Sequence, residues 1–133
     1  MKKLTESVWN FLVDEGFRPT DKYEYFVFDC KGRTFIYDKN EDDEYYFQLI
    51  LPNIYKFDEE TKLDVLNEIN RINSEYKVVK ACFSQNNNVY LCVEVFMNAD
   101  SNIKPVFQRS LYVMMQAYHS FMSEKKIVSD KNS

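Results

Sequence analysis

Glycine is nearly absent from this chain, which has only two glycines among its 133 residues. Loops that cradle phosphate groups, and the fingerprint of dinucleotide-binding folds, both need several closely spaced glycines. Gly16 and Gly32 lie far apart in the sequence. The sequence therefore excludes both kinds of glycine-rich nucleotide-binding motif.

Histidine is scarcer still, because His119 is the only one in the chain. A Ser-His-Asp arrangement would have to use it, and the chain has no nucleophile-elbow motif. We expect His119 to lie at the surface or at the boundary of the core, near the end of the last helix. The sequence therefore predicts that the protein is not an enzyme, and it indicates no cofactor.

The three cysteines, Cys30, Cys82 and Cys92, form no close-spaced pair. A structural zinc site needs four ligands, which commonly come in such pairs, so a zinc site here would require all three thiols and His119. We expect instead that the cysteines are reduced and pack as small apolar residues, without a metal.

Long apolar runs and basic clusters are also missing. No segment approaches the run of about 18 apolar residues that a membrane-spanning helix requires. The net charge is −4, so neither nucleic acid nor an anionic membrane is an expected partner. The first residues, Met1–Glu6, are basic but lead into an amphipathic segment, unlike the apolar core of a signal peptide. We therefore expect a cytoplasmic protein.

Aromatic side chains, by contrast, are abundant at 17% of all residues, with 11 Phe and 10 Tyr. Aromatic residues favour β-strands. Apolar residues make up 45% and charged residues 29%, which is typical of one globular domain at this length. We predict a single α+β domain over residues 1–122, followed by a polar, frayed tail over residues 123–133.

Three segments have the apolar periodicity of amphipathic helices. The first is Leu4–Glu15, which ends before a glycine suited to the left-handed position after a helix. The second is Leu63–Tyr76, and its apolar residues fall on one stripe. The third is Pro105–Met122, where the proline is tolerated because it lies in the first helical turn.

Five segments have the composition of β-strands and group into two blocks around the second helix. Pro52 is expected to end the third strand, because proline cannot donate a hydrogen bond to a sheet. The predicted strands are Tyr23–Cys30, Arg33–Asp38, Tyr45–Leu51, Lys77–Ser84 and Val89–Phe96.

Two hairpin registers follow from the turns and the apolar pattern. A two-residue turn at Lys31-Gly32 sets Phe28 opposite Phe35 in the first hairpin. In the second hairpin, an all-apolar face results if Phe83 pairs with Leu91, and the neighbouring pairs then follow. These expected pairs are Ala81 with Val93, Val79 with Val95, Lys80 with Glu94, and Cys82 with Cys92.

The order of helix, three strands, helix, two strands and helix indicates an α+β fold, with helices on an antiparallel sheet in a two-layer sandwich. This α-β-β-β-α-β-β-α order is similar to that of the small type III secretion chaperones. The segment Leu66–Asn73, followed by Lys77-Val78 and a hairpin, resembles more specifically the YbjN-type relatives of that fold. The secretion chaperones dimerise and bind extended client segments, so the resemblance implies protein binding. It brings no catalytic residues with it.

Candidate binding residues fall into two groups. If helices cover only one face of the sheet, Tyr46, Ile50 and Phe96 remain exposed and mark an interface, unless the tail or loops cover them. Asn70 and Asn73 lie on or near the packed side of the second helix. They either satisfy backbone groups at the seam between helix and sheet, or bind a ligand there.

The acidic cluster Asp38–Glu44 offers a further alternative, since carboxylates can hold a cation. It lacks the glycine and the spacing of an EF-hand loop, so a solvated hairpin turn is the preferred interpretation.

These observations favour a non-enzymatic protein-binding module, chaperone-like or regulatory, that binds a client protein or forms a homodimer. The alternative is a small-ligand sensing domain, with a pocket between helix and sheet near Asn70, Asn73 and Tyr76. An enzyme is the third possibility.

Overall fold

The computed structural model describes residues 1–123 and contains three helices and a six-stranded antiparallel sheet. The order of the strands across the sheet is β1-β2-β3-β4-β6-β5. The predicted α+β fold class is confirmed, with one additional two-residue strand, β1, after the first helix. The elements are α1 (Lys3–Asp14), β1 (Thr20–Asp21), β2 (Tyr25–Cys30), β3 (Arg33–Asp38), β4 (Tyr46–Lys56), α2 (Lys62–Glu75), β5 (Val79–Phe83), β6 (Asn88–Phe96) and α3 (Ile103–Met122).

The tail predicted from residue 123 onward is described only at its first residue. Ser123 follows α3, and its N–H donates to the carbonyl oxygen of His119. Residues 124–133 lie outside the described residues. Within residues 1–123, no helix combines the length and the apolar character that a membrane crossing requires.

The predicted ending of α1 is confirmed in detail. Gly16 adopts a φ of 81°, and its N–H donates to the carbonyl oxygen of Val13 at 3.1 Å. The N–H of Phe17 reaches back to the carbonyl oxygen of Leu12 at 2.9 Å. Both bonds belong to the Schellman ending, which satisfies helix carbonyls that would otherwise lack a donor.

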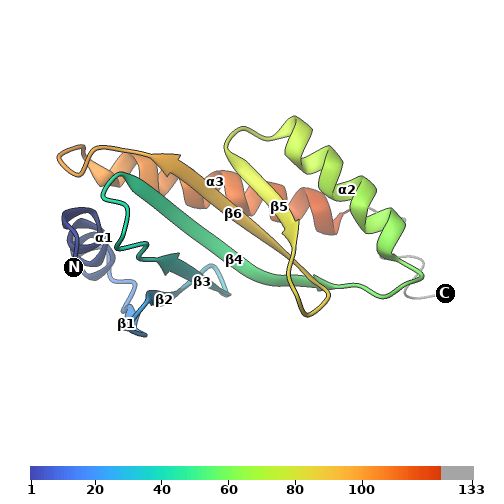
Figure 1. Ribbon diagram of the computed structural model, residues 1–133, viewed down its shortest axis with the longest axis horizontal. Helices are drawn as coiled ribbons and strands as arrows, with labels where there is room; N and C mark the ends of the chain where they lie inside the picture. Colours follow the sequence, from blue (N-terminus) through green and yellow to red (C-terminus); the bar gives the residue numbers. More distant parts are fainter. Residues whose placement is uncertain (124–133) are drawn as a thin grey trace.

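The core lies between the helices and one face of the sheet. The long α3 runs behind β4, β6 and β5 in the view of Figure 1, with α1 at one end of the sheet and α2 beside β5. Alternate strand residues point toward the helices and are buried, because successive side chains of a strand face opposite ways. Among these buried residues are Phe26, Phe28, Phe35, Tyr37, Phe47, Leu49, Leu51 and Leu91.

The prediction that Pro52 ends its strand is wrong, because β4 continues to Lys56. The pairing of β4 with β6 is interrupted between Leu51 and Tyr55, where Asn53 has a φ of 54°. At such a bulge the ladder of hydrogen bonds is already broken, so the missing N–H of proline costs little.

The predicted register of the second hairpin is wrong by two residues. Phe83 lies opposite Val89 rather than Leu91, and Cys82 lies opposite Tyr90 rather than Cys92. The turn is tighter than predicted, since the N–H of Ser84 already donates to the carbonyl oxygen of Asn88 at 2.8 Å. Asn87 makes this possible by adopting a φ of 61°. A shift of two preserves which side chains face the core, so the apolar pattern could not distinguish the two registers.

Candidate functional site

The sheet face that points away from the helices is the main candidate site. Along β4, buried side chains alternate with half-buried ones, so this face is only partly covered. None of the three helices packs over it within residues 1–123. The strand registers align four apolar residues of this face into a row across the sheet, namely Val27, Ile36, Ile50 and Cys92. We call this face the open face.

The three predicted interface residues, Tyr46, Ile50 and Phe96, all lie on the open face. Tyr46 pairs directly with Phe96 across β4 and β6, and their ring centroids are 6.0 Å apart. Phe96 is 79% exposed, which is unusual for a phenylalanine in a sheet. No described loop covers it, so the open face presents an exposed aromatic pair in addition to the apolar row.

A polar network lies between the aromatic pair and the apolar row, centred on the Glu94 carboxylate. It accepts hydrogen bonds from Lys80 Nζ at 2.8 Å and from Gln48 Nε2 at 3.2 Å. The Tyr46 hydroxyl and the Cys92 thiol also donate to it. The bond from Lys80 holds the pKa of Glu94 below its usual range. A carboxylate with a lowered pKa is a poor proton acceptor, so this network suits binding better than acid–base catalysis.

The two thiols of the second hairpin are free and lie on the open face, although not directly opposite each other. Cys82 is half-buried and pairs with Tyr90, whereas Cys92 is buried and pairs with Lys80. Burial raises the pKa of Cys92 to about 12. Within residues 1–123, no three side chains of His, Cys, Asp or Glu come together as metal ligands. Because its pKa is raised, Cys92 is protonated at neutral pH, and its thiol packs within the sheet while it donates to Glu94.

Asn73 has the structural role predicted for it, and Asn70 does not. The Asn73 Oδ1 accepts from the backbone N–H of Ala81 at 2.7 Å, and its Nδ2 donates to the Ala81 carbonyl at 3.1 Å. Because β5 is an edge strand, this amide satisfies backbone groups that a further strand would otherwise pair with. The Asn70 side chain is exposed on α2. The two amides do not converge, so the structure does not favour a ligand pocket built on both.

We predict that Asn73→Ala lowers the free energy of unfolding by about 1 kcal/mol, because water can replace only part of the lost bonding at this exposed edge. Asn70→Ala is the matched control, since it brings the same gain in helix propensity without removing the bonds to Ala81. Urea unfolding of both variants measures the difference. Equal stabilities for the two variants would contradict this role for Asn73.

The acidic turn after β3 binds the ammonium group of Lys2, a contact that the sequence pattern does not predict. Lys2 Nζ donates to the carbonyl oxygens of Asn40 and Asp43, both at 2.8 Å, and of Tyr46 at 2.9 Å. Burial lowers the pKa of Lys2, opposed by the carboxylates around it. The acceptors are backbone carbonyls, and no residue pattern in Asp38–Glu44 signals them.

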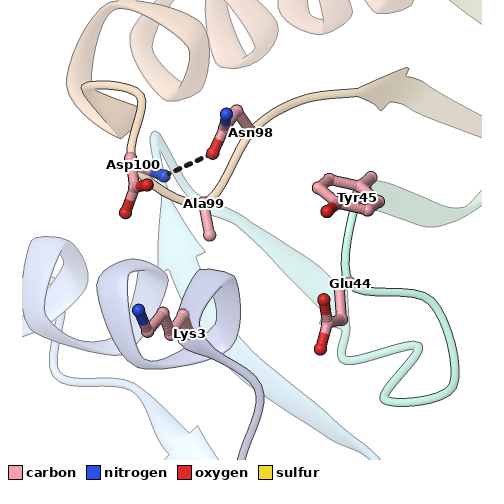
Figure 2. Close-up of a pocket in the computed structure, with 6 residues that line it drawn as sticks. All are labelled: Lys3, Glu44, Tyr45, Asn98, Ala99 and Asp100. Atoms are coloured by element: carbon pink, nitrogen blue, oxygen red, sulfur yellow. Dashed lines mark hydrogen bonds between the residues drawn. The ribbon is translucent and has the colours of Figure 1, made fainter.

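A polar cavity of about 290 Å³ lies between the start of α1 and two loops, one before β4 and one before α3 (Figure 2). The N–H of Asp100 donates to Asn98 Oδ1 at 2.9 Å within its rim. Figure 2 shows the Lys3 ammonium and the Glu44 carboxylate on opposite sides of the cavity, without a common point. The cavity therefore lacks a set of convergent polar groups. Its lining residues are Lys3, Glu44, Tyr45, Asn98, Ala99 and Asp100.

Comparison with solved structures shows the fold. YbjN from E. coli, a candidate transcription regulator, matches with a TM-score of 0.65 and 10% identity, over 86% of this chain and 87% of YbjN. An uncharacterised protein from Methanothermobacter thermautotrophicus matches with a TM-score of 0.50 and 17% identity, over 89% of this chain and 99% of that protein. No protein-family profile and no curated protein sequence matches the chain. The chain has a YbjN-type fold, while the resemblance to type III secretion chaperones stays a prediction.

Proposed function

We propose that this protein is a cytoplasmic, non-enzymatic protein-binding module with a regulatory or chaperone-like role. Its first partner is a second copy of the same chain, bound through the open face. The observation that supports this most directly is the apolar row beside the exposed Phe96, on a face without a covering helix in residues 1–123. Such surfaces usually mark interfaces.

The dimensions of the open face are compatible with a homodimer. Five strands at about 4.8 Å spacing, over about three alternate residues each, give roughly 450–500 Å² of sheet per copy. Two such faces bury roughly 900–1,000 Å², at the lower limit for a biological interface. The Glu94 network adds polar groups that are already paired within the face, so packing against them leaves few unsatisfied donors.

A regulatory role is consistent with the fold of the neighbour. YbjN is described as a candidate transcription regulator, and the shared fold makes a regulatory module a reasonable class for this chain. The net charge of −4 disfavours direct contact with nucleic acid, so regulation here acts through a protein partner.

We predict that light scattering at high micromolar concentration gives a particle of twice the 16.0 kDa mass of the chain. Phe96→Ser should raise the dimer dissociation constant about 30-fold, because a large aromatic side chain that becomes buried in an interface contributes about 2 kcal/mol. Its side chain is 79% exposed in the single chain, so the variant should keep its fold.

Tyr23→Ser is the matched control, because Tyr23 is 91% exposed but lies outside the open face, in the turn before β2. It should dimerise like the unchanged protein. A 16.0 kDa particle for the unchanged protein at high micromolar concentration would exclude the homodimer.

A further inference from the structure

On the side of β6 that faces β5, the last residues of β6 have no strand partner. β5 pairs with β6 only from Val79 opposite Val93 to Phe83 opposite Val89. On its other side, β6 stays paired with β4 as far as Phe96. Within the described residues, no strand lies along the β5 side of β6 after Val93.

The backbone of this stretch points its hydrogen-bonding groups into the vacant side. The N–H of Met97 donates to the Tyr45 carbonyl at 2.7 Å, so the backbone N–H and C=O groups of odd-numbered residues in β6 point toward β4. The Ser84 N–H donates to the Asn88 carbonyl at 2.8 Å, so the backbone groups of even-numbered residues in β6 point toward β5. Because these directions alternate along a strand, the N–H and C=O groups of Glu94 and Phe96 face the vacant side.

A strained turn lies directly before β5. Val78 has a φ of 72°, and the N–H of Val79 donates across it to the Lys77 carbonyl at 2.8 Å. A positive φ is strained at a β-branched residue such as valine. The turn interrupts the extended backbone directly before β5, and pairing with β6 starts at Val79 opposite Val93.

An apolar groove of about 210 Å³ runs beside the unpaired stretch, between β6, α3 and the strained turn. This exceeds a cavity of about 150 Å³ that accepts benzene, so one or two branched side chains fit. Two cations, Lys77 and Arg109, line it as exposed residues, and neither has an ion-pair partner among residues 1–123. The apolar lining consists of Val78, Val93, Val95, Val106 and Val113.

We propose that this groove binds an extended segment of another protein, rich in branched apolar and acidic residues, which adds to the sheet beside Glu94 and Phe96. The segment places apolar side chains against the valines and pairs its backbone with β6, as in β-strand addition. Its acidic residues meet Lys77 and Arg109. A second copy of this chain is disfavoured here, because symmetric pairing would bring the same two cations against each other.

The probe for this test is a blocked, fluorescein-labelled octapeptide of the order Glu-Thr-Val-Thr-Val-Thr-Glu-Thr. Its valines and glutamates share one strand face, because Lys77 and Arg109 line the groove on the same side as the valines. Two control peptides carry lysine in place of glutamate, or N-methyl groups on alternate residues that remove the strand-pairing donors. Fluorescence anisotropy should show binding of the acidic peptide, with binding of both controls at least tenfold weaker. Amide exchange should slow at Glu94 and Phe96 when the acidic peptide is bound. Absent binding, equal binding of either control, or unchanged exchange would overturn the proposal.

Variants locate the binding site. The double variant Lys77→Gln, Arg109→Gln should weaken binding of the acidic peptide about tenfold, because two exposed charge contacts are lost. The control Lys22→Gln, Lys31→Gln removes two exposed cations far from the groove in the fold and should bind like the unchanged protein. Val27→Ser, in the apolar row of the open face and three strands away from β6, should also bind normally, which separates this site from the open face. Equal weakening by both double variants would overturn the groove as the site.

Discussion

Phe107→Ala is expected to lower the free energy of unfolding by about 4 kcal/mol, the largest effect of any change considered for this protein. Phe107 is fully buried, and its ring lies 4.7 Å from the centroid of Phe11 and 5.7 Å from that of Phe28. It also meets Phe47 edge-on at 5.8 Å. One ring therefore connects α3 with α1, β2 and β4. The neighbouring rings belong to different helices and strands, so they cannot move together to fill the cavity that Phe107→Ala leaves. The unfilled cavity therefore adds nearly its full cost to the loss of stability.

Urea unfolding measures this effect. Tyr112→Ala is the matched control, because Tyr112 is an aromatic residue of the same helix but is 62% exposed. Its removal should change the stability by no more than about 0.5 kcal/mol. A loss below about 2 kcal/mol for Phe107→Ala would show that the elements around Phe107 repack.

Arg71→Met is expected to lower the free energy of unfolding by about 3 kcal/mol. The Arg71 guanidinium donates from Nη2 to Glu68 Oε2 at 2.8 Å and from Nη1 to Glu75 Oε2 at 3.0 Å. It also donates to Ser120 Oγ at 3.0 Å, and so connects α2 with α3. The Glu68 side chain is only 11% exposed, so the variant leaves a nearly buried carboxylate without its cation. The loss of stability comes mainly from the Glu68 carboxylate that stays buried without a cation, and less from the lost attraction between the two charges.

Two further variants test this explanation. Glu68→Met combined with Arg71→Met should be more stable than Arg71→Met alone, since it removes the unpaired charge. Lys62→Met, at an exposed position of the same helix, should be within about 0.5 kcal/mol of the unchanged protein. If the double variant is less stable than Arg71→Met, the contact with Ser120 rather than the charge of Glu68 decides the stability.

Local patterns in the sequence determined the helices and the first hairpin. Leu63–Tyr76 was predicted from its stripe, and the structure buries Val65 and Ile72 in α2 (Lys62–Glu75). The pairing of Phe28 with Phe35 was also predicted, because the two-residue turn at Lys31-Gly32 permits one register. Both turn residues have positive φ, at 51° and 79°, as a tight hairpin requires. These features depend on residues that are close in sequence.

The second hairpin and β4 show where local patterns stop being sufficient. The four-residue stretch Gln85–Asn88 accommodates turns of different lengths, and a shift of two residues leaves every side chain on the same face. Only the packing of Phe83 against Phe57, with ring centroids 4.1 Å apart, and the pairing with the rest of the sheet distinguish the registers. The bulge at Pro52 likewise depends on β6, which lies far along the chain.

The candidate sites also combine features that local sequence predicts with features that depend on the packing of distant segments. Alternation along a strand predicts that Tyr46 and Ile50 share one face, and the pairing of Tyr46 with Phe96 in the structure places Phe96 on the same face. The sequence could not determine which face the helices cover, since both faces carry apolar residues. The tertiary structure also decided that the Asn73 side chain bonds the backbone of Ala81. It decided as well that β5 begins only opposite Val93, which leaves the last residues of β6 unpaired beside a groove. These features arise where segments distant in sequence meet, and the positions of those segments follow from the packing of the whole chain rather than from any local pattern.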